Sequence, residues 1–365
     1  MTVADPPAAS PAAGRAPAGA PTARSVITTP VLRFAGRSIR IRPRLVIVAG
    51  IALVVLVAVI AASLMVGTIR LGFGDLATVF AGDAKPSLER SVLGRRLPRA
   101  LTAAFVGALL GMSGALFQSL SRNPLGSPDI IGFTSGAATA AVFQIIVFGG
   151  GMLATALAAV VGGMLTALAV YLLARRDGVT GGLRLVLVGI GVGAVVSAFS
   201  SLLIARADIN DAMVAQLWGA GSLLGRGWTH AWLTLAALVV LTPLLLVLGR
   251  KLALMEMGDD TAHSIGVRVE RTRFIAMLVG VTAAAAATAV AGPIAFIAFA
   301  SGHIARHLAP VPGVLIGLSA VVGAALLAGA DLLAQNLDVG MRTPVGLVTS
   351  LLGGVYLLWL LARRI

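Results

Sequence analysis

Cysteine is absent from the 365-residue sequence, and lysine occurs only at Lys85 and Lys251. Without cysteine, the chain has no disulfide, no thiolate metal site and no cysteine nucleophile. Neither lysine stands in the G-x-x-x-x-G-K-[ST] pattern that cradles nucleotide phosphates. The chain therefore has no P-loop of its own, and any ATP that its function requires is hydrolysed by a partner.

Histidines and carboxylates are also few and scattered. The four histidines do not stand at metal-ligand spacing with carboxylates, so we predict no metal site and no cofactor. Ion-coupled carriers commonly place acidic or histidine side chains in the membrane interior. Here Asp129 and Asp331 lie near the ends of apolar runs and no carboxylate lies mid-span. This pattern weighs against a carrier driven by protons or sodium.

Charged residues make up only 12% of the chain and apolar residues 58%, a composition that favours a membrane protein. The net charge of +14 would also suit a nucleic-acid binder. Such proteins, however, gather basic residues on one face with aromatics that stack on bases. Aromatics are only 5% here and the charges flank apolar runs, so the excess indicates membrane topology and contact with anionic lipid, with no nucleic acid as partner.

Apolar runs of about 20 residues, long enough for a helix to cross a bilayer, recur along the chain. We predict an all-α membrane protein with about ten transmembrane helices, at residues 45–67, 98–120, 128–148, 152–174, 184–205, 230–249, 273–292, 293–309, 312–334 and 344–362. Gly107, Gly111 and Gly114 favour close helix packing within the chain over a dimer face. Gly292 and Pro293 predict a broken or sharply turned helix.

Residues 1–44 are rich in Pro, Ala and Arg and have no apolar core, so we expect a disordered tail before a transmembrane domain at 45–365. The first apolar run begins at Leu45, too late for a secretory signal peptide. Arginines directly precede that run and place the N-terminus in the cytoplasm. Ten crossings then return the C-terminus to the cytoplasm.

Two polar segments interrupt this pattern. Residues 250–273 form a cytoplasmic loop with the sequence MGDDTAHSIG at 257–266, which predicts short helices around a glycine turn that reach a cytosolic partner; an ordinary solvated loop is the alternative. On the outward side an arginine cluster is expected to receive carboxylates of an extracytoplasmic protein. Its alternatives are lipid phosphate or pairing with Glu89 and Asp83. The cluster consists of Arg90, Arg95, Arg96 and Arg99.

From about residue 88 to the C-terminus, the sequence resembles the FecCD family of iron-siderophore and cobalamin ABC-importer permeases. The motifs that carry the resemblance are RLPR at 96–99, QSLSRNPLGSPDIIG at 118–132, WGAGSL at 218–223, MGDDTAHSIG at 257–266, GHIAR at 302–306, ADLLA at 330–334 and PVG at 344–346. The resemblance implies the type II importer permease architecture in a bacterial cytoplasmic membrane. It also implies a second permease subunit, two cytoplasmic ATP-binding subunits and an extracytoplasmic substrate-binding protein as partners.

The resemblance assigns roles to the polar segments. Residues 257–266 become the coupling region that docks on the ATPase subunit, where small residues permit close approach and a bulky charge at Ala262 is expected to uncouple an otherwise folded subunit. The coupling residues are Gly258, Asp259, Ala262, Ser264 and Gly266. The residues that dock the binding protein are Arg96, Arg99 and Arg342.

Three departures from the family pattern predict pairing with a different permease chain. Gly302 replaces the usual Pro, Gln335 the usual Arg, and Arg342 begins a segment that usually reads Glu-Leu-Pro. Ferric siderophore is the favoured cargo, with cobalamin or haem as alternatives within the family. An ion-coupled secondary transporter or channel is the alternative outside it, and dependence on partner proteins separates the two classes.

Overall fold

The computed structural model describes residues 31–34, 37–40, 42–67, 70–129, 131–176, 179–180, 182–337 and 343–362. The chain divides into two units, residues 1–46 and 47–365. In the first unit, β1 (Val31–Phe34) and β2 (Arg37–Arg40) form an antiparallel ribbon. These two strands lie within the tail predicted at 1–44, and they pair through backbone hydrogen bonds. Residues 1–30 lie outside the described part.

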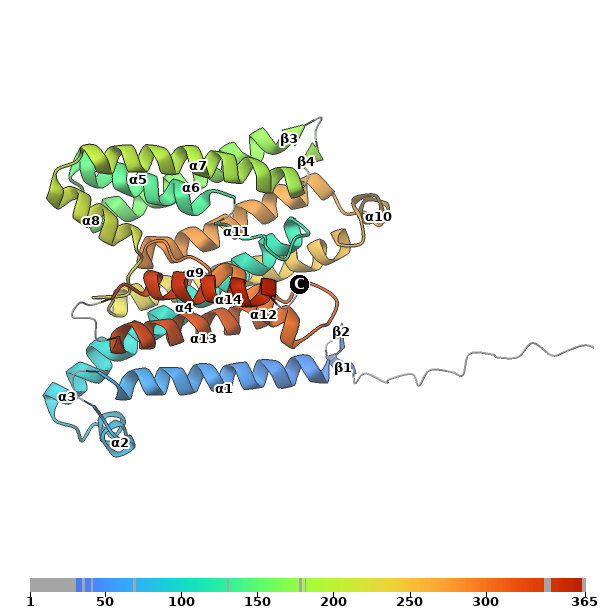
Figure 1. Ribbon diagram of the computed structural model, residues 1–365. Helices are drawn as coiled ribbons and strands as arrows, with labels where there is room; N and C mark the ends of the chain where they lie inside the picture. Colours follow the sequence, from blue (N-terminus) through green and yellow to red (C-terminus); the bar gives the residue numbers. More distant parts are fainter. Residues whose placement is uncertain are drawn as a thin grey trace, which may run out of the picture. The chain divides into compact units, whose positions relative to one another are not determined.

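A helix occurs in each of the ten predicted apolar runs, which confirms the all-helical membrane fold (Figure 1). These helices are α1 (Pro43–Met65), α4 (Leu97–Leu120), α5 (Phe133–Phe148), α6 (Met152–Ala174), α7 (Gly182–Arg206), α9 (Trp228–Met255), α11 (Val269–Ala291), α12 (Ile297–Leu308), α13 (Ile316–Asn336) and α14 (Val345–Ala362). Among the described residues, seven helical stretches are long and apolar enough to span a membrane. α12 has only 12 residues, about 18 Å, so the predicted independent crossing at 293–309 is too short.

Shorter elements connect these helices. They are α2 (Phe73–Ala81), α3 (Pro86–Ser91), the π-helical turn η1 (Val92–Arg96), α8 (Ile209–Gly219), α10 (Asp259–Ser264) and the paired strands β3 (Arg175–Arg176) and β4 (Val179–Thr180). α3, η1 and α4 run on as one helical stretch from Pro86 to Leu120. Figure 1 places α3 and α10 at opposite ends of the long helices.

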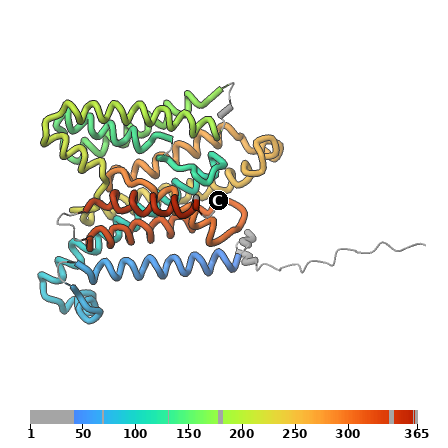
Figure 2. The backbone as a smooth tube through the Cα atoms, in the orientation of Figure 1, coloured from blue at the N-terminus to red at the C-terminus, as the bar shows by residue number. Residues whose placement is uncertain are grey.

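α4 lies at the centre of the second unit, packed against α9, α11, α12 and α13. Its glycines bring backbones into direct contact: a Cβ on Gly111 would lie 2.2 Å from the Ser319 carbonyl oxygen, and one on Gly114 1.8 Å from that of Ala298. The prediction of close packing within the chain is confirmed. α5, α6 and α7 form a second group, seen as the green tubes of Figure 2.

The predicted helix break is present between α11 and α12. Gly292 at φ 72° and Phe296 at φ 69° turn the chain, and residues 291–294 are buried. The Ala291 carbonyl, freed by the break, accepts a 2.7 Å hydrogen bond from the Ser222 amide. Surrounding protein thus satisfies the interrupted backbone, as non-helical backbone at membrane depth requires.

We predict that Gly111→Ala destabilises the protein by about 1–3 kcal/mol, because the added methyl overpacks α4 against a backbone carbonyl that has no side-chain freedom to move. Gly191→Ala in α7 is the control, since its Cβ would meet open space. Thermal unfolding of the purified protein measures both. Equal unfolding temperatures for the two variants would show that α4 tolerates wider spacing.

Candidate functional site

α10 extends beyond the ends of α9 and α11 on two glycine turns. α9 ends at Met255, the chain turns at Gly258 (φ 117°), and it turns again at Gly266 (φ 88°) before α11 begins at Val269. These φ values strain any residue that carries a Cβ, so both turns depend on glycine. The Val267 amide closes the helix by donating to the Ala262 carbonyl at 2.9 Å. The predicted short helix with a glycine turn is present.

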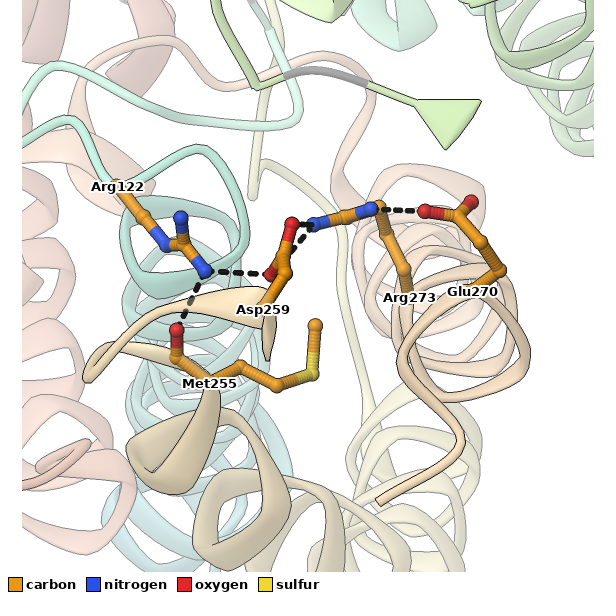
Figure 3. A network of polar contacts seen from close by, with 5 residues as sticks. All are labelled: Arg122, Met255, Asp259, Glu270 and Arg273. Atoms are coloured by element: carbon orange, nitrogen blue, oxygen red, sulfur yellow. Dashed lines mark hydrogen bonds and ion pairs between the residues drawn. The ribbon is translucent and has the colours of Figure 1, made fainter. Parts of the chain in front are cut away.

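Asp259, the first residue of α10, lies between two arginines (Figure 3). Its carboxylate accepts from Arg122 Nη2 at 2.6 Å and from Arg273 Nη2 at 3.0 Å. Arg122 also donates to the Met255 carbonyl at 2.5 Å, and Arg273 contacts Glu270. We call Arg122, Asp259, Glu270 and Arg273 the α10 clamp. It fixes the start of α10 to α11 and to the loop that follows α4.

Glu256 provides a second attachment just before α10. Its Oε1 accepts from Ser119 Oγ in α4 at 2.8 Å and lies 3.9 Å from Arg306 Nη2 in α12. The base of α10 is therefore joined by polar contacts to α4, α11 and α12. The contacts to α4 and α11 are charge-assisted hydrogen bonds, which are short and directional, and the contact to α12 is a longer ion pair.

The predicted coupling residues differ in position. Ser264 and Gly266 are exposed, while Gly258 and Asp259 are half-buried. Ala262 is 0% exposed in this chain, and its predicted contact with another subunit stays a prediction. It lies on the inner face of α10 within the chain's own core. A bulky charged residue there is expected to displace α10 rather than leave the subunit folded.

Sequence reasoning missed Arg122, Glu256 and Arg273 as parts of this site. Arg122 lies within the 118–132 motif, but its partner is 137 positions away. Arg273 is only 5% exposed, a burial that its place at the start of an apolar run does not reveal. The sequence signal that could have indicated these ion pairs is the acidic pair Asp259 and Asp260 between two segments that contain arginines.

At the opposite end of α4, Arg99 forms a bidentate pair with Asp331 of α13. Arg99 Nε and Nη2 donate to the two carboxylate oxygens at 3.0 and 2.8 Å, and Gln335 Nε2 donates to the same carboxylate at 2.8 Å. The Asp331 side chain is 3% exposed and that of Arg99 is 18%. The carboxylate partner of Arg99 is thus neither Glu89 nor Asp83, the two weighed from the sequence.

The other arginines of this end lie outside that pair. Arg96 is half-buried and donates to the Leu64 carbonyl at 2.7 Å, while Arg90 and Arg95 are exposed. Arg90 Nε donates to the Pro86 carbonyl at 3.1 Å. Arg342, the third predicted docking residue, lies outside the described residues.

A family model described as the FecCD transport family matches residues 53–363. The chain belongs to the FecCD transport family. It is 45% identical, over 82% of its length and 90% of the relative, to the ferric enterobactin permease FepG of Escherichia coli (strain K12). It is 36% identical, over 87% and 97%, to the iron(3+)-hydroxamate permease FhuG of Bacillus subtilis (strain 168).

A solved structure described as an inward-facing conformation of a metal-chelate type ABC transporter superposes with a TM-score of 0.77. The two are 26% identical, and the match covers 87% of this chain and 99% of that one. This FecCD protein is therefore a multi-pass permease of a bacterial ABC importer. Its ATPase is a separate subunit, and a binding protein is a further partner.

For the FecCD permease, we predict that Asp259→Asn loosens α10. The change removes the charge that holds Arg122 and Arg273; because the carboxylate is 37% exposed and Arg273 keeps Glu270, we expect a loss of only about 1–2 kcal/mol. Hydrogen exchange across residues 256–268 should speed up. Asp260→Asn, an exposed neighbour, is the control; equal exchange in the two variants would contradict the clamp.

Arg99→Gln is expected to lower the free energy of unfolding by about 3–5 kcal/mol, because Asp331 would lose its ion-pair partner in a buried position and keep only Gln335 as a side-chain partner. Arg99→Gln combined with Asp331→Asn should recover part of the loss. Thermal unfolding measures each variant, with exposed Arg95→Gln as control. A loss at Arg99 no larger than at Arg95 would refute a structural role for the pair.

Proposed function

We propose that this chain is the permease subunit through which a bacterial ABC importer carries ferric siderophores into the cytoplasm. The observation that supports coupling to ATP is α10, a short helix held by the clamp at one end of the long helices with its outer face exposed. The cargo rests on the relatives, whose names specify ferric enterobactin and iron(3+)-hydroxamate. In this proposal both termini lie in the cytoplasm.

The outer face of α10 is the contact for the ATPase subunit. Met257, Asp260, His263, Ser264 and Ile265 are exposed there, with two large apolar side chains beside polar ones. Such a mixed surface suits burial in a cleft of a partner. Movement of that cleft reaches α4 through Arg122 and Glu256, so nucleotide binding by the ATPase alters the helices that surround the pathway.

At the opposite end, the exposed Arg90 and Arg95 together with Arg96 receive carboxylates of the substrate-binding protein. Arg99 positions α4 against α13 through Asp331, so its place in this docking set passes to Arg95. Arg342 remains a proposed member of the set.

Gln335 supports a partner permease of different sequence. Where the family pattern has an arginine, the Gln335 amide donates to the already paired Asp331. The docking face of this subunit therefore lacks one cation. A substrate-binding protein whose two contact surfaces differ in charge fits a pair of different permease subunits better than a pair of identical ones.

The decisive test reconstitutes the chain in proteoliposomes with its ATPase subunits, partner permease and binding protein. Ferric siderophore uptake should require ATP and every subunit, and ferric chelates should compete while cobalamin and haem should not. Uptake by this chain alone under an ion gradient would favour the ion-coupled carrier or channel. If uptake were driven by ATP but only cobalamin or haem competed, the cargo would be cobalamin or haem and not a ferric siderophore.

Charge reversal tests the docking face. Arg95→Glu is expected to slow association of the binding protein about tenfold at low salt, with a smaller change in dissociation, because exposed charges act mainly on encounter. Arg175→Glu, an exposed arginine at the α10 end, is the control. Surface-plasmon measurements over a range of salt concentrations give the association and dissociation rates. An unchanged association rate would favour the alternative that Arg95 contacts lipid phosphate.

A further inference from the structure

A cavity of about 580 Å³ opens between the end of α9 and the start of α11, beside the segment that follows α10. Three cationic residues line it: Lys251 in the last turns of α9, Arg268 just before α11, and Arg271 in its first turn. The rest of its wall consists of the apolar Leu248, Leu254 and Ile275 of the same two helices, Thr272 of α11, and the connecting residues Ile265, Gly266 and Val267. Both cationic and apolar side chains thus line the cavity.

The three cations are not neutralised within the described part of the chain. No carboxylate lines the cavity, and the side chains of Lys251, Arg268 and Arg271 form no hydrogen bond or ion pair with described residues. Nearby carboxylates are engaged elsewhere: Asp259 and Glu270 by the clamp, and Glu256 by Ser119. The cavity therefore keeps three charges that an anion can satisfy.

The direction of α11 strengthens this preference. Arg268 and Arg271 lie at its N-terminus, where the helix dipole is positive and cations are unfavourable. An anion at the same place interacts favourably with the dipole and with both guanidinium groups. The helix dipole thus attracts an anion in addition to the side-chain charges.

The apolar wall continues along both helices. Leu254 is 39% exposed; Val247 lies one turn before Lys251 in α9 and is 55% exposed, and Leu278 lies one turn after Ile275 in α11 and is 41% exposed. Residues one turn apart share a helix face, so two apolar stripes lead away from the cationic end. In a membrane-spanning chain such stripes face acyl chains.

We propose that this cavity binds an anionic phospholipid, with the headgroup phosphate among Lys251, Arg268 and Arg271 and an acyl chain along α9 and α11. A basic pocket between membrane helices at the headgroup level has the chemistry to hold such a lipid. The adjoining wall contains Ile265 and Gly266, so the lipid also supports the return of the chain from α10. The site depends neither on the cargo nor on ATP.

The test titrates lipids onto the purified, delipidated full-length chain in detergent and counts bound lipids by native mass spectrometry. Phosphatidylglycerol and cardiolipin should bind more tightly than phosphatidylcholine. Lys251→Ala, Arg268→Ala and Arg271→Ala should each weaken the anionic lipids about fivefold. Arg271→Lys should retain most of the affinity because it keeps the charge.

Arg250→Ala is the matched control, an exposed arginine at the same end of α9 that does not line the cavity. Unfolding temperature and elution volume check that the variants fold. Equal binding of phosphatidylcholine, or equal loss at Arg250 and Arg271, would leave only non-specific lipid around the helices. Displacement by millimolar inorganic phosphate would make it a soluble-anion site. If the three alanine variants kept the lipid selectivity of the unmodified chain but no longer bound the ATPase subunit, the cavity would be a protein contact. Each of these results would overturn the proposal.

Discussion

Direct backbone contact between α4 and its neighbours is the constraint on which the other features depend. At Gly111 and Gly114 a single methyl group would overlap a carbonyl oxygen of α13 or of α12. Close contact without side chains fixes the position of the middle of α4, because packed interiors leave no free space for a shift. Both ends of this helix carry charged contacts, Arg99 with Asp331 at one and Arg122 with Asp259 just past the other.

The charges at the two ends divide into paired and available groups. Within the described residues, Asp331 accepts from Arg99 and Gln335, Asp259 accepts from Arg122 and Arg273, and Glu256 accepts from Ser119. What remains exposed is mostly positive, in a chain whose net charge is +14. In our proposals the same excess of cations serves two kinds of contact, acidic protein surfaces and anionic lipid, at opposite ends of the long helices.

Local sequence pattern was enough to predict the helices but not the contacts between them. Apolar run length and the Gly292–Pro293 pair predicted ten helices and one break, since both follow from backbone hydrogen bonding in lipid. The short α8 and α10, and the half-length α12, depend on packing and turns rather than on hydropathy. The partner of Arg99 is 232 positions away, and the burial of Ala262 depends on which face of α10 meets the core.

In the proposed function, α10 joins this permease to its ATPase subunit by its outer face. Because the chain contains no cysteine, single cysteines can be placed by Ser264→Cys on the exposed face and Ala262→Cys on the buried face. Cross-linking of the assembled transporter should join the subunits through position 264 and not through position 262. If the cysteine at position 264 formed no cross-link and still reacted with a water-soluble maleimide in the assembled transporter, the outer face of α10 would not contact the ATPase subunit.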